Sequence, residues 1–270
     1  MYQVFYGLAA PPFSITPDPR YLFYSRRHRE AFDHVLFGIR ERKGFIQLTG
    51  AVGAGKSTLC RAVLEELDGE VDSAVILNPV LSGLQFLRCV LHEFSLDDRG
   101  NDRVRLLQRL NAFLLERVAA GRDVVLFVDE AQDAPDSLLE EIRLLSNLET
   151  DDCKLLQIVL IGQSELRSRL DRPALRQLRQ RITVRYHLEP LGRTETGALI
   201  AHRLAVAGAN GRPTFTRAAV NAIWWHARGV PRLVNAICDK TLLCGYVEGR
   251  DELGWPQVRR AVRELEGKST

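Results

Sequence analysis

The residues best suited to chemistry form one short glycine-rich segment. Residues 50–57 read Gly-Ala-Val-Gly-Ala-Gly-Lys-Ser and match the pattern G-x-x-x-x-G-K-[ST], the Walker A motif, at every fixed position. The glycines of such a segment let backbone N–H groups close on a phosphate, and the next helix adds the positive end of its dipole. Lys56 is then expected to reach the β- and γ-phosphates, and the Ser57 hydroxyl to coordinate Mg²⁺. The motif predicts a site for ATP with Mg²⁺.

The flanking sequence has the pattern that this motif needs. The apolar run 45–48 predicts a buried strand before it, and the apolar residues of 59–67 fall on one face of a helix after it. A chance glycine-rich turn would not be expected to have strand, motif and helix in register. The expected contacts to the nucleotide are Gly50, Ala51, Val52, Gly53, Ala54, Gly55, Lys56, Ser57 and Thr58.

A second group of candidates follows the apolar run 124–128, which is typical of a central parallel strand buried on both faces. The run ends in Asp129 and Glu130, and carboxylates in such a place are costly unless they have partners or a function. We expect Asp129 to hold Mg²⁺ through water and Glu130 to orient and polarise the attacking water, as a Walker B pair. The alternative for Glu130 is a solvated carboxylate that caps a helix.

Two further polar residues lie where strands and helices meet. Gln163 follows the predicted strand 155–161 and could contact the γ-phosphate or the attacking water; the alternative is an amide that caps the helix from Ser164. Arg232 follows a turn at 229–231 and could reach the γ-phosphate, coupling the C-terminal helices to nucleotide state. The alternative is an ordinary arginine at a helix N-terminus, where its charge would oppose the dipole.

Arginines are concentrated between residues 167 and 185, where the only acidic residue is Asp171. Guanidinium groups suit phosphate recognition through paired hydrogen bonds, although most exposed arginines are solvated or salt-bridged. In a ring-forming ATPase, one arginine placed here enters the neighbour's active site. Arg181 is the first candidate for this arginine finger and Arg179 the second, with Arg176 also near. The segment's arginines are Arg167, Arg169, Arg172, Arg176, Arg179, Arg181 and Arg185.

Composition excludes several classes of protein. The 46% hydrophobic content is enough for a packed core, while a mean hydropathy of −0.12 and the lack of a long apolar run argue against a membrane span. A net charge of +3 is too small to indicate nucleic acid by itself. The five cysteines form no C-x-x-C pair, and the six histidines have no metal-ligand spacing, so neither type is given a role. We expect a cytoplasmic protein.

Alternation of strand and helix patterns predicts an α/β fold with a five-stranded parallel sheet and helices on both faces. The expected strands are 45–48, 73–77, 124–128, 155–161 and 182–188. From residue 194 no strand pattern remains, and four helices predict a small all-α lid domain. We place the domains at 1–190 and 191–270, with residues 1–24 as an aromatic, proline-rich lead-in to the first. Of the adjacent Trp224 and Trp225, one is expected to pack and the other to face a partner.

This layout of a P-loop core and an α-helical tail resembles the AAA+ ATPases. In detail the chain is similar to the ExeA/GspA-type ATPases of bacterial secretion and pilus assembly, and among them to those of MSHA type IV pilus biogenesis. The resemblance runs almost end to end. Its most specific motifs are in four segments, 144–149, 162–163, 177–181 and 229–235. Its motifs include 5–8, 12–13, 16–18, 50–56, 78–79, 128–132, 144–149, 154–157, 161–163, 175–181 and 229–235.

The resemblance implies an oligomeric cytoplasmic ATPase that supports assembly of an envelope machine, with sensor roles for Gln163 and Arg232. The longer family members add a membrane helix and a periplasmic peptidoglycan-binding portion, which this sequence lacks. We therefore expect docking to an inner-membrane pilus or secretion component. The family also has relatives in transposons that assemble on DNA to select target sites, which is the alternative function. The modest charge and the lack of a recognisable DNA-binding module predict weak DNA binding or none.

Overall fold

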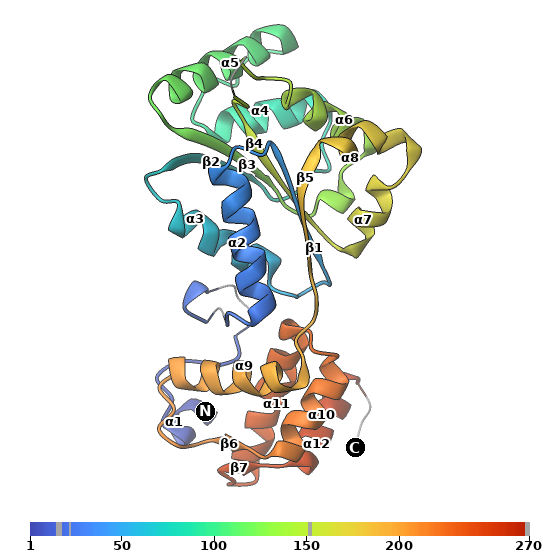
Figure 1. Cartoon of the computed structure of the whole chain (residues 1–270). Helices are drawn as coiled ribbons and strands as arrows, with labels where there is room; N and C mark the ends of the chain where they lie inside the picture. The colour runs from blue at the N-terminus through green and yellow to red at the C-terminus, as the bar shows by residue number, and fades with distance from the viewer. Residues whose placement is uncertain (15–17, 22, 151–152, 268–270) are drawn as a thin grey trace. The chain divides into compact units, whose positions relative to one another are not determined.

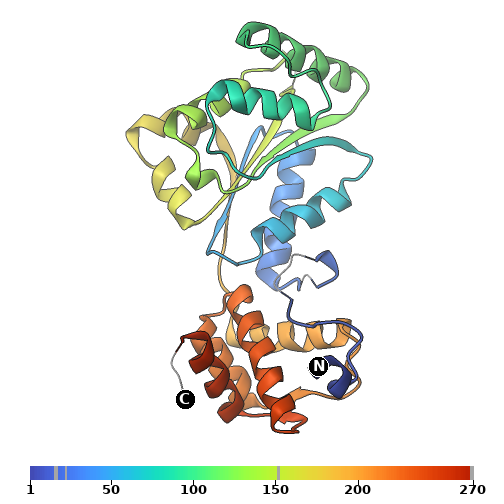
Figure 2. The same ribbon diagram turned by 180° about the vertical axis from the view of Figure 1, so that it is seen from behind.

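The computed structural model of the chain describes residues 1–14, 18–21, 23–150 and 153–267. Thr16 and Pro17 of the 16–18 motif lie outside these ranges. The chain divides into two compact units, which we call the sheet unit and the helical unit. The sheet unit holds Arg29–Gly50 and Leu59–Leu188, and the helical unit holds Met1–His28, Ala51–Thr58 and Glu189–Thr270. Figures 1 and 2 show the elements of each unit from two sides.

The sheet unit is built on the predicted five-stranded parallel sheet. Its strand order is β2-β3-β4-β1-β5. After β1 the chain crosses to β2 at the edge of the sheet, and β3 and β4 then fill the positions between β2 and β1. The strands are β1 (Phe45–Gly50), β2 (Val71–Ile76), β3 (Asp123–Val128), β4 (Gln157–Gly162) and β5 (Ile182–Leu188). All residues of β1 and β4 are buried, which explains why their sequences are largely apolar on both faces, with Gln47, Thr49 and Gln157 as buried polar exceptions.

Because every pairing is parallel, the carboxyl ends of β1, β3 and β4 lie at one edge of the sheet. Thr49 is in register with Gly162, and Val128 with Leu160. The residues that follow β3 and β4 therefore leave the sheet at the same edge, and β1 runs into the glycine-rich segment there. In open α/β sheets this edge is where ligands bind.

Helices cover both faces of the sheet, as predicted. The Ile46 side chain of β1 meets Gly38 of α2, whereas Gln47, the next residue, lines a cavity with Leu170 of α7. Alternate residues of a strand point to opposite faces, so α2 and α7 lie on opposite sides of β1, as Figure 1 shows. The helices are α2 (Arg26–Arg40), α3 (Lys56–Glu66), α4 (Gly83–Glu93), α5 (Arg103–Ala119), α6 (Asp136–Leu145), α7 (Ser164–Leu170) and α8 (Arg176–Arg181). Short 3₁₀ turns are η2 (Ala131–Asp133) and η3 (Pro173–Leu175).

The helical unit contains the four predicted C-terminal helices. They are α9 (Arg193–Val206), α10 (Arg217–Ala227), α11 (Pro231–Val247) and α12 (Trp255–Leu265). The prediction of no strand beyond residue 194 was wrong, because β6 (Thr214–Phe215) pairs with β7 (Glu252–Leu253) in parallel. Two-residue strands are too short to leave an alternating pattern in the sequence. On α10, Trp224 donates from Nε1 to the carbonyl of Leu191 at 3.2 Å, while Trp225 is 72% exposed.

The N-terminal segment belongs to the helical unit, which differs from the expected division at residue 190. It includes α1 (Tyr2–Tyr6) and η1 (Pro19–Tyr21). Tyr6 and Phe13 are each 1% exposed and share one apolar core with residues of α9 to α12. Ala9 N–H donates to Ala207 at 2.9 Å, and the Arg203 guanidinium donates to the Pro12 carbonyl at 3.0 Å. Apolar burial and backbone pairing join the two ends of the chain, which local sequence patterns do not reveal.

Replacing Phe13 by alanine tests this grouping. The ring is buried and lies edge-on to Phe215 with centroids 6.2 Å apart, so Phe13→Ala should lower the free energy of unfolding by about 3–5 kcal/mol. The control Val4→Ala removes a side chain that is 87% exposed and should change it by less than about 0.5 kcal/mol. Urea denaturation followed by circular dichroism measures both. Equal, small effects would show that residues 1–14 are not part of this core.

Candidate functional site

The glycine-rich loop, residues 51–55, connects β1 to α3. Gly53 and Gly55 have φ angles of 75° and 101°, a region that residues with a side chain rarely adopt. Lys56 opens α3, is 7% exposed, and donates from Nζ to the Ala51 carbonyl at 3.1 Å. The loop therefore has the backbone that its motif requires, with a lysine and a helix N-terminus at its end.

His28 holds this loop from a position 26 residues away in sequence. Its Nε2 lies 3.0 Å from the carbonyl oxygen of Ala54, and its Nδ1 lies 2.8 Å from Oγ of Ser25. A carbonyl can only accept, so Nε2 carries the proton and the Ser25 hydroxyl donates to Nδ1. The Ser25 Oγ also accepts from the His28 backbone N–H at 3.2 Å and so caps the first turn of α2. Burial lowers the pKa of His28, and the bond to Ala54 offsets part of that shift.

Arg232 reaches the loop through its backbone. It lies in the first turn of α11, and its N–H donates to the Gly53 carbonyl at 3.2 Å. A Cβ on Gly53 would lie only 2.5 Å from the Arg232 Cβ, so the close approach requires glycine at that position. The Arg232 side chain is exposed. The C-terminal helices thus contact the loop directly, within the helical unit.

The acidic residues lie at the carboxyl end of β3, in the sheet unit. Asp129 is 7% exposed; its N–H donates to the Ile76 carbonyl, and its carboxylate accepts from the Glu130 N–H, each at 2.8 Å. Glu130 has a φ of 49°, which is uncommon for a residue with a side chain. Strained backbone of this kind persists where surrounding contacts determine it, and such sites are often functional.

Two glutamine side chains fix the Glu130 carboxylate. Its Oε2 accepts from Nε2 of Gln132 at 2.7 Å and from Nε2 of Gln163 at 3.3 Å. The Gln132 Oε1 in turn accepts from the Gln163 backbone N–H at 2.9 Å, which links the ends of β3 and β4. Arg169 completes the cluster by donating to the Gln132 carbonyl and to the Asp136 carboxylate. A carboxylate held by two amides has a defined position for orienting a water molecule.

The arginine-finger candidates have different partners within the chain. Arg181 is half-buried and donates from Nη1 to Oγ of Ser146 at 2.7 Å. Arg179 is exposed and pairs with Asp171, with an Nε to Oδ1 distance of 3.1 Å. Arg176 is exposed at the start of α8. All three lie in α8, and no hydrogen bond or ion pair among the described residues joins any of them to the Glu130 cluster.

Sequence reasoning missed His28 and gave Gln132 no role of its own. The contact between His28 and the loop depends on chain segments that meet only after folding, so no local signal pointed to it. Gln132 is two residues beyond Glu130 in the 128–132 motif, and that closeness was an available signal. No histidine was given a role from spacing, and for His28 the structure corrects this.

The donor set fits Mg²⁺ held together with phosphates rather than in a cage of protein ligands. Among the described residues, no group of three or more His, Cys, Asp or Glu side chains is arranged to hold a metal ion. Mg²⁺ usually retains several waters and takes one or two protein oxygens besides substrate phosphates. The Ser57 hydroxyl and the Asp129 carboxylate are of the required oxygen type.

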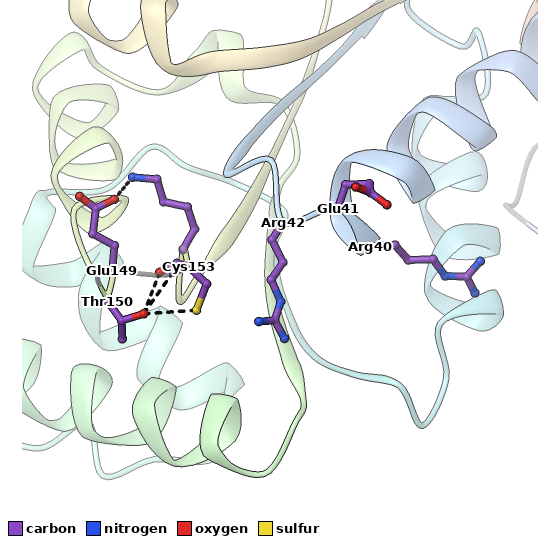
Figure 3. Close-up of a pocket in the computed structure, with 7 residues that line it drawn as sticks. Arg40, Glu41, Arg42, Glu149, Thr150 and Cys153 are labelled. Atoms are coloured by element: carbon purple, nitrogen blue, oxygen red, sulfur yellow. Dashed lines mark hydrogen bonds and ion pairs between the residues drawn. The ribbon is translucent and has the colours of Figure 1, made fainter.

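A cavity of about 850 Å³ lies in the sheet unit (Figure 3). It is near the amino ends of β1 and β4, at the edge of the sheet opposite to the Glu130 cluster. Its basic residues already have carboxylate partners. Lys154 pairs with Glu149, Arg40 with Glu70 at 3.3 Å, and Arg42 with Asp123 at 2.6 Å. Figure 3 also shows Thr150 bonded to Cys153, which closes a turn. The cavity's size therefore does not indicate a site for an anion.

Comparison with known proteins agrees with the geometry. Residues 39–170 match the model of a family described as AAA domain. This stretch is similar to AAA domains. Over 268 residues the chain is 44% identical to General secretion pathway protein A of Aeromonas hydrophila, which covers 99% of this chain. The match spans 49% of that relative, about half its length. The two similarities agree with each other, because the region that resembles an AAA domain lies within the region that resembles this relative.

Several solved structures share the fold of this chain. The ORC2 protein of Aeropyrum pernix, in ADPNP–ADP complexes, matches with a TM-score of 0.69 over 94% of this chain and 71% of its own, at 17% identity. Cdc6p from Pyrobaculum aerophilum gives a TM-score of 0.70 over 94% and 70%, also at 17% identity. The Thermotoga maritima RuvB Holliday junction branch migration motor gives 0.59 over 88% and 69%, at 20% identity. At these identities the likeness shows the fold alone.

One negative finding concerns membranes. Within the described parts of the chain, no helix combines the length and the apolar character needed to cross a bilayer.

The buried His28 predicts a pH dependence of stability. Because its folded pKa lies below the ordinary value of about 6.5, the unfolded chain binds more protons between those two values. The His28 contribution is therefore complete above pH 6.5 and is lost as the pH falls below it. His28→Gln can keep a donor to Ala54 without titrating, so it should lose less stability than wild type between pH 7.5 and 5.5. Urea unfolding measures this, with the exposed His226→Gln as control. Equal losses in wild type and His28→Gln would contradict the assignment.

Proposed function

We propose that this chain is a Mg²⁺-dependent ATPase that hydrolyses ATP to ADP and phosphate. The observation that carries the proposal is the Glu130 carboxylate, held by Gln132 and Gln163 at the end of β3 in a region that is similar to AAA domains. An ordinary surface carboxylate would not need two amides and a strained backbone to position it. Glu130 would act as the base that orients and polarises the attacking water.

The other residues would divide the remaining tasks. Backbone N–H groups of residues 50–58 would surround the phosphates, and the Lys56 ammonium would balance their charge. The Ser57 hydroxyl would bind Mg²⁺ directly and Asp129 through water. When bound, the ion neutralises charge on the phosphate oxygens. Gln163, already bonded to Glu130, would sense the γ-phosphate or the water.

Arg232 is proposed to couple nucleotide state to the helical unit. Its backbone bond to Gly53 anchors α11 to the glycine-rich loop, while the side chain remains exposed and available to a phosphate. A change at the loop would therefore be passed to the C-terminal helices through a direct contact.

We further propose that the chain works as a homo-oligomer, in a ring where Arg181 enters the neighbour's active site. Arg179 and Arg176 are the next candidates. The bond from Arg181 to Ser146 defines where its side chain lies in one subunit, and a phosphate on a neighbour would compete for it.

The biological role that we propose is assembly of a type II secretion machine or of an MSHA-like type IV pilus. The similarity to General secretion pathway protein A supports the secretion part. The chain would act in the cytoplasm at the inner membrane, docked on a membrane component of that machine. A transposon-type role on DNA receives no support from a specific contact, so DNA binding is expected to be weak or absent.

Two variants test the catalytic proposal together. Glu130→Gln should bind ATP and lose about 10²–10⁴-fold in turnover, because the base is removed. Arg181→Ala should also bind ATP and lose about 10³–10⁵-fold. Phosphate release measures turnover, and calorimetry measures binding. Glu165→Gln and Arg172→Ala are the controls, since both side chains are exposed and lie outside the proposed site. Near-normal turnover in Glu130→Gln would remove it from the role of base.

Mixing the two variants then tests the oligomer. A mixed interface can pair an intact Glu130 from one subunit with an intact Arg181 from the next, so activity should partly return. A mixture as inactive as its components, while each variant still oligomerises, would mean that Arg181 does not act across subunits. The same mixture made with Arg179→Ala would then test the second candidate.

A further inference from the structure

A cavity of about 290 Å³ lies on the sheet face that carries α7 and α8. Residues of β1, α7, α8 and β5 line it, and all of them belong to the sheet unit. In Figure 1 these four elements lie together, with α7 beside β1 and α8 beside β5, and both pairs are in contact. The glycine-rich loop belongs to the other unit, so this cavity is built from different residues.

The wall formed by β1 contains an amide that lines the cavity and has no hydrogen-bond partner among the described residues. Gln47 is 5% exposed, and its side chain makes no hydrogen bond to any residue that the structure describes. Thr49, two residues further along the same wall, shows the contrast. Its hydroxyl donates to the Tyr186 carbonyl at 3.4 Å and lies 2.9 Å from Nδ1 of His187. The Gln47 amide is not among the enclosed polar atoms that lack a partner, so it is open to the cavity, where a ligand can bond to it.

The lining that comes from β5 and from the α7 and α8 region has an excess of positive charge. Arg167, Arg179 and Arg185 line it together with a single carboxylate, Asp171, which pairs with Arg179 at 3.1 Å. Arg185 donates to the backbone carbonyl of Arg179, which orients its guanidinium without neutralising it. Arg167 makes no hydrogen bond or ion pair with a described residue. Two guanidinium charges therefore face the cavity without a carboxylate partner among the described residues.

We propose that this cavity binds a phosphoryl group, as inorganic phosphate or as a small phosphate monoester. Guanidinium groups match the oxygens of phosphate with paired, charge-assisted hydrogen bonds, which Arg167 and Arg185 would supply. The Gln47 amide would donate to a further oxygen from the β1 wall. The volume lies at the lower end of the range for small-molecule sites, which is enough for a small anion.

Titration calorimetry with phosphate tests the site, provided that phosphate binding at the glycine-rich loop is prevented. One arm uses this chain with Lys56→Ala, and the other uses wild type saturated with ADP and Mg²⁺, so the test does not depend on one variant folding. Inorganic phosphate and glycerol 3-phosphate are the two probes. We expect saturable binding in both arms, and the tighter probe identifies whether free phosphate or an ester is the natural ligand.

Three substitutions, each made in the Lys56→Ala background and in ADP-saturated protein, assign the binding. Arg167→Gln should weaken phosphate binding by at least about tenfold, because a charged hydrogen bond is lost. Arg172→Gln, which removes an exposed arginine of the same segment outside the cavity, should leave it unchanged. Gln47→Leu keeps the volume, so it should weaken binding without lowering the midpoint of thermal unfolding.

Absence of phosphate binding in both arms would overturn the proposal, as would equal effects of Arg167→Gln and Arg172→Gln. A loss of binding in Gln47→Leu with a matching loss of thermal stability would also overturn it, because Gln47 would then be structural. None of these outcomes depends on ATP hydrolysis. The failure of this site and the failure of the ATPase proposal can therefore be distinguished.

Discussion

The structure depends on how the carbonyl groups of the glycine-rich loop are paired. Ala54 accepts from the His28 imidazole, Gly53 from the Arg232 backbone, and Ala51 from the Lys56 ammonium. A peptide plane whose carbonyl is fixed has its N–H direction fixed as well, and those directions decide whether a loop can surround an anion. The three donors come from the N-terminal segment, the C-terminal helices and α3. The loop consequently belongs to the same compact unit as both ends of the chain.

Much of the fold was predictable because it depends on local patterns. Continuous apolar runs gave the buried strands, and β5 begins and ends at the predicted residues, Ile182 and Leu188. The fixed spacing of the glycine motif placed Lys56 at a helix N-terminus, and the end of the β3 run placed Asp129 and Glu130. In each case one stretch of sequence determines both the element and the position of the side chain that follows it.

What could not be predicted depends on contacts between distant segments. His28 and Ala54 are 26 residues apart, and Ala9 pairs with Ala207, 198 residues further along the chain. The strand order follows from packing and not from any single strand. The arginine segment gives the clearest example, because its members look equivalent in the sequence. In the structure Arg169 supports the Glu130 cluster, Arg181 contacts Ser146, and Arg167 lines a separate cavity.

The central claim is that ATP with Mg²⁺ binds at the glycine-rich loop. A crystal structure of the chain with a non-hydrolysable ATP analogue and Mg²⁺ tests it most directly. The account predicts phosphates bonded to backbone N–H groups of residues 53–57, with Lys56 Nζ on a phosphate oxygen and Ser57 Oγ on the ion. It also predicts that the His28 and Arg232 contacts to the loop persist. A nucleotide bound elsewhere, with Lys56 still donating to Ala51, would contradict the account.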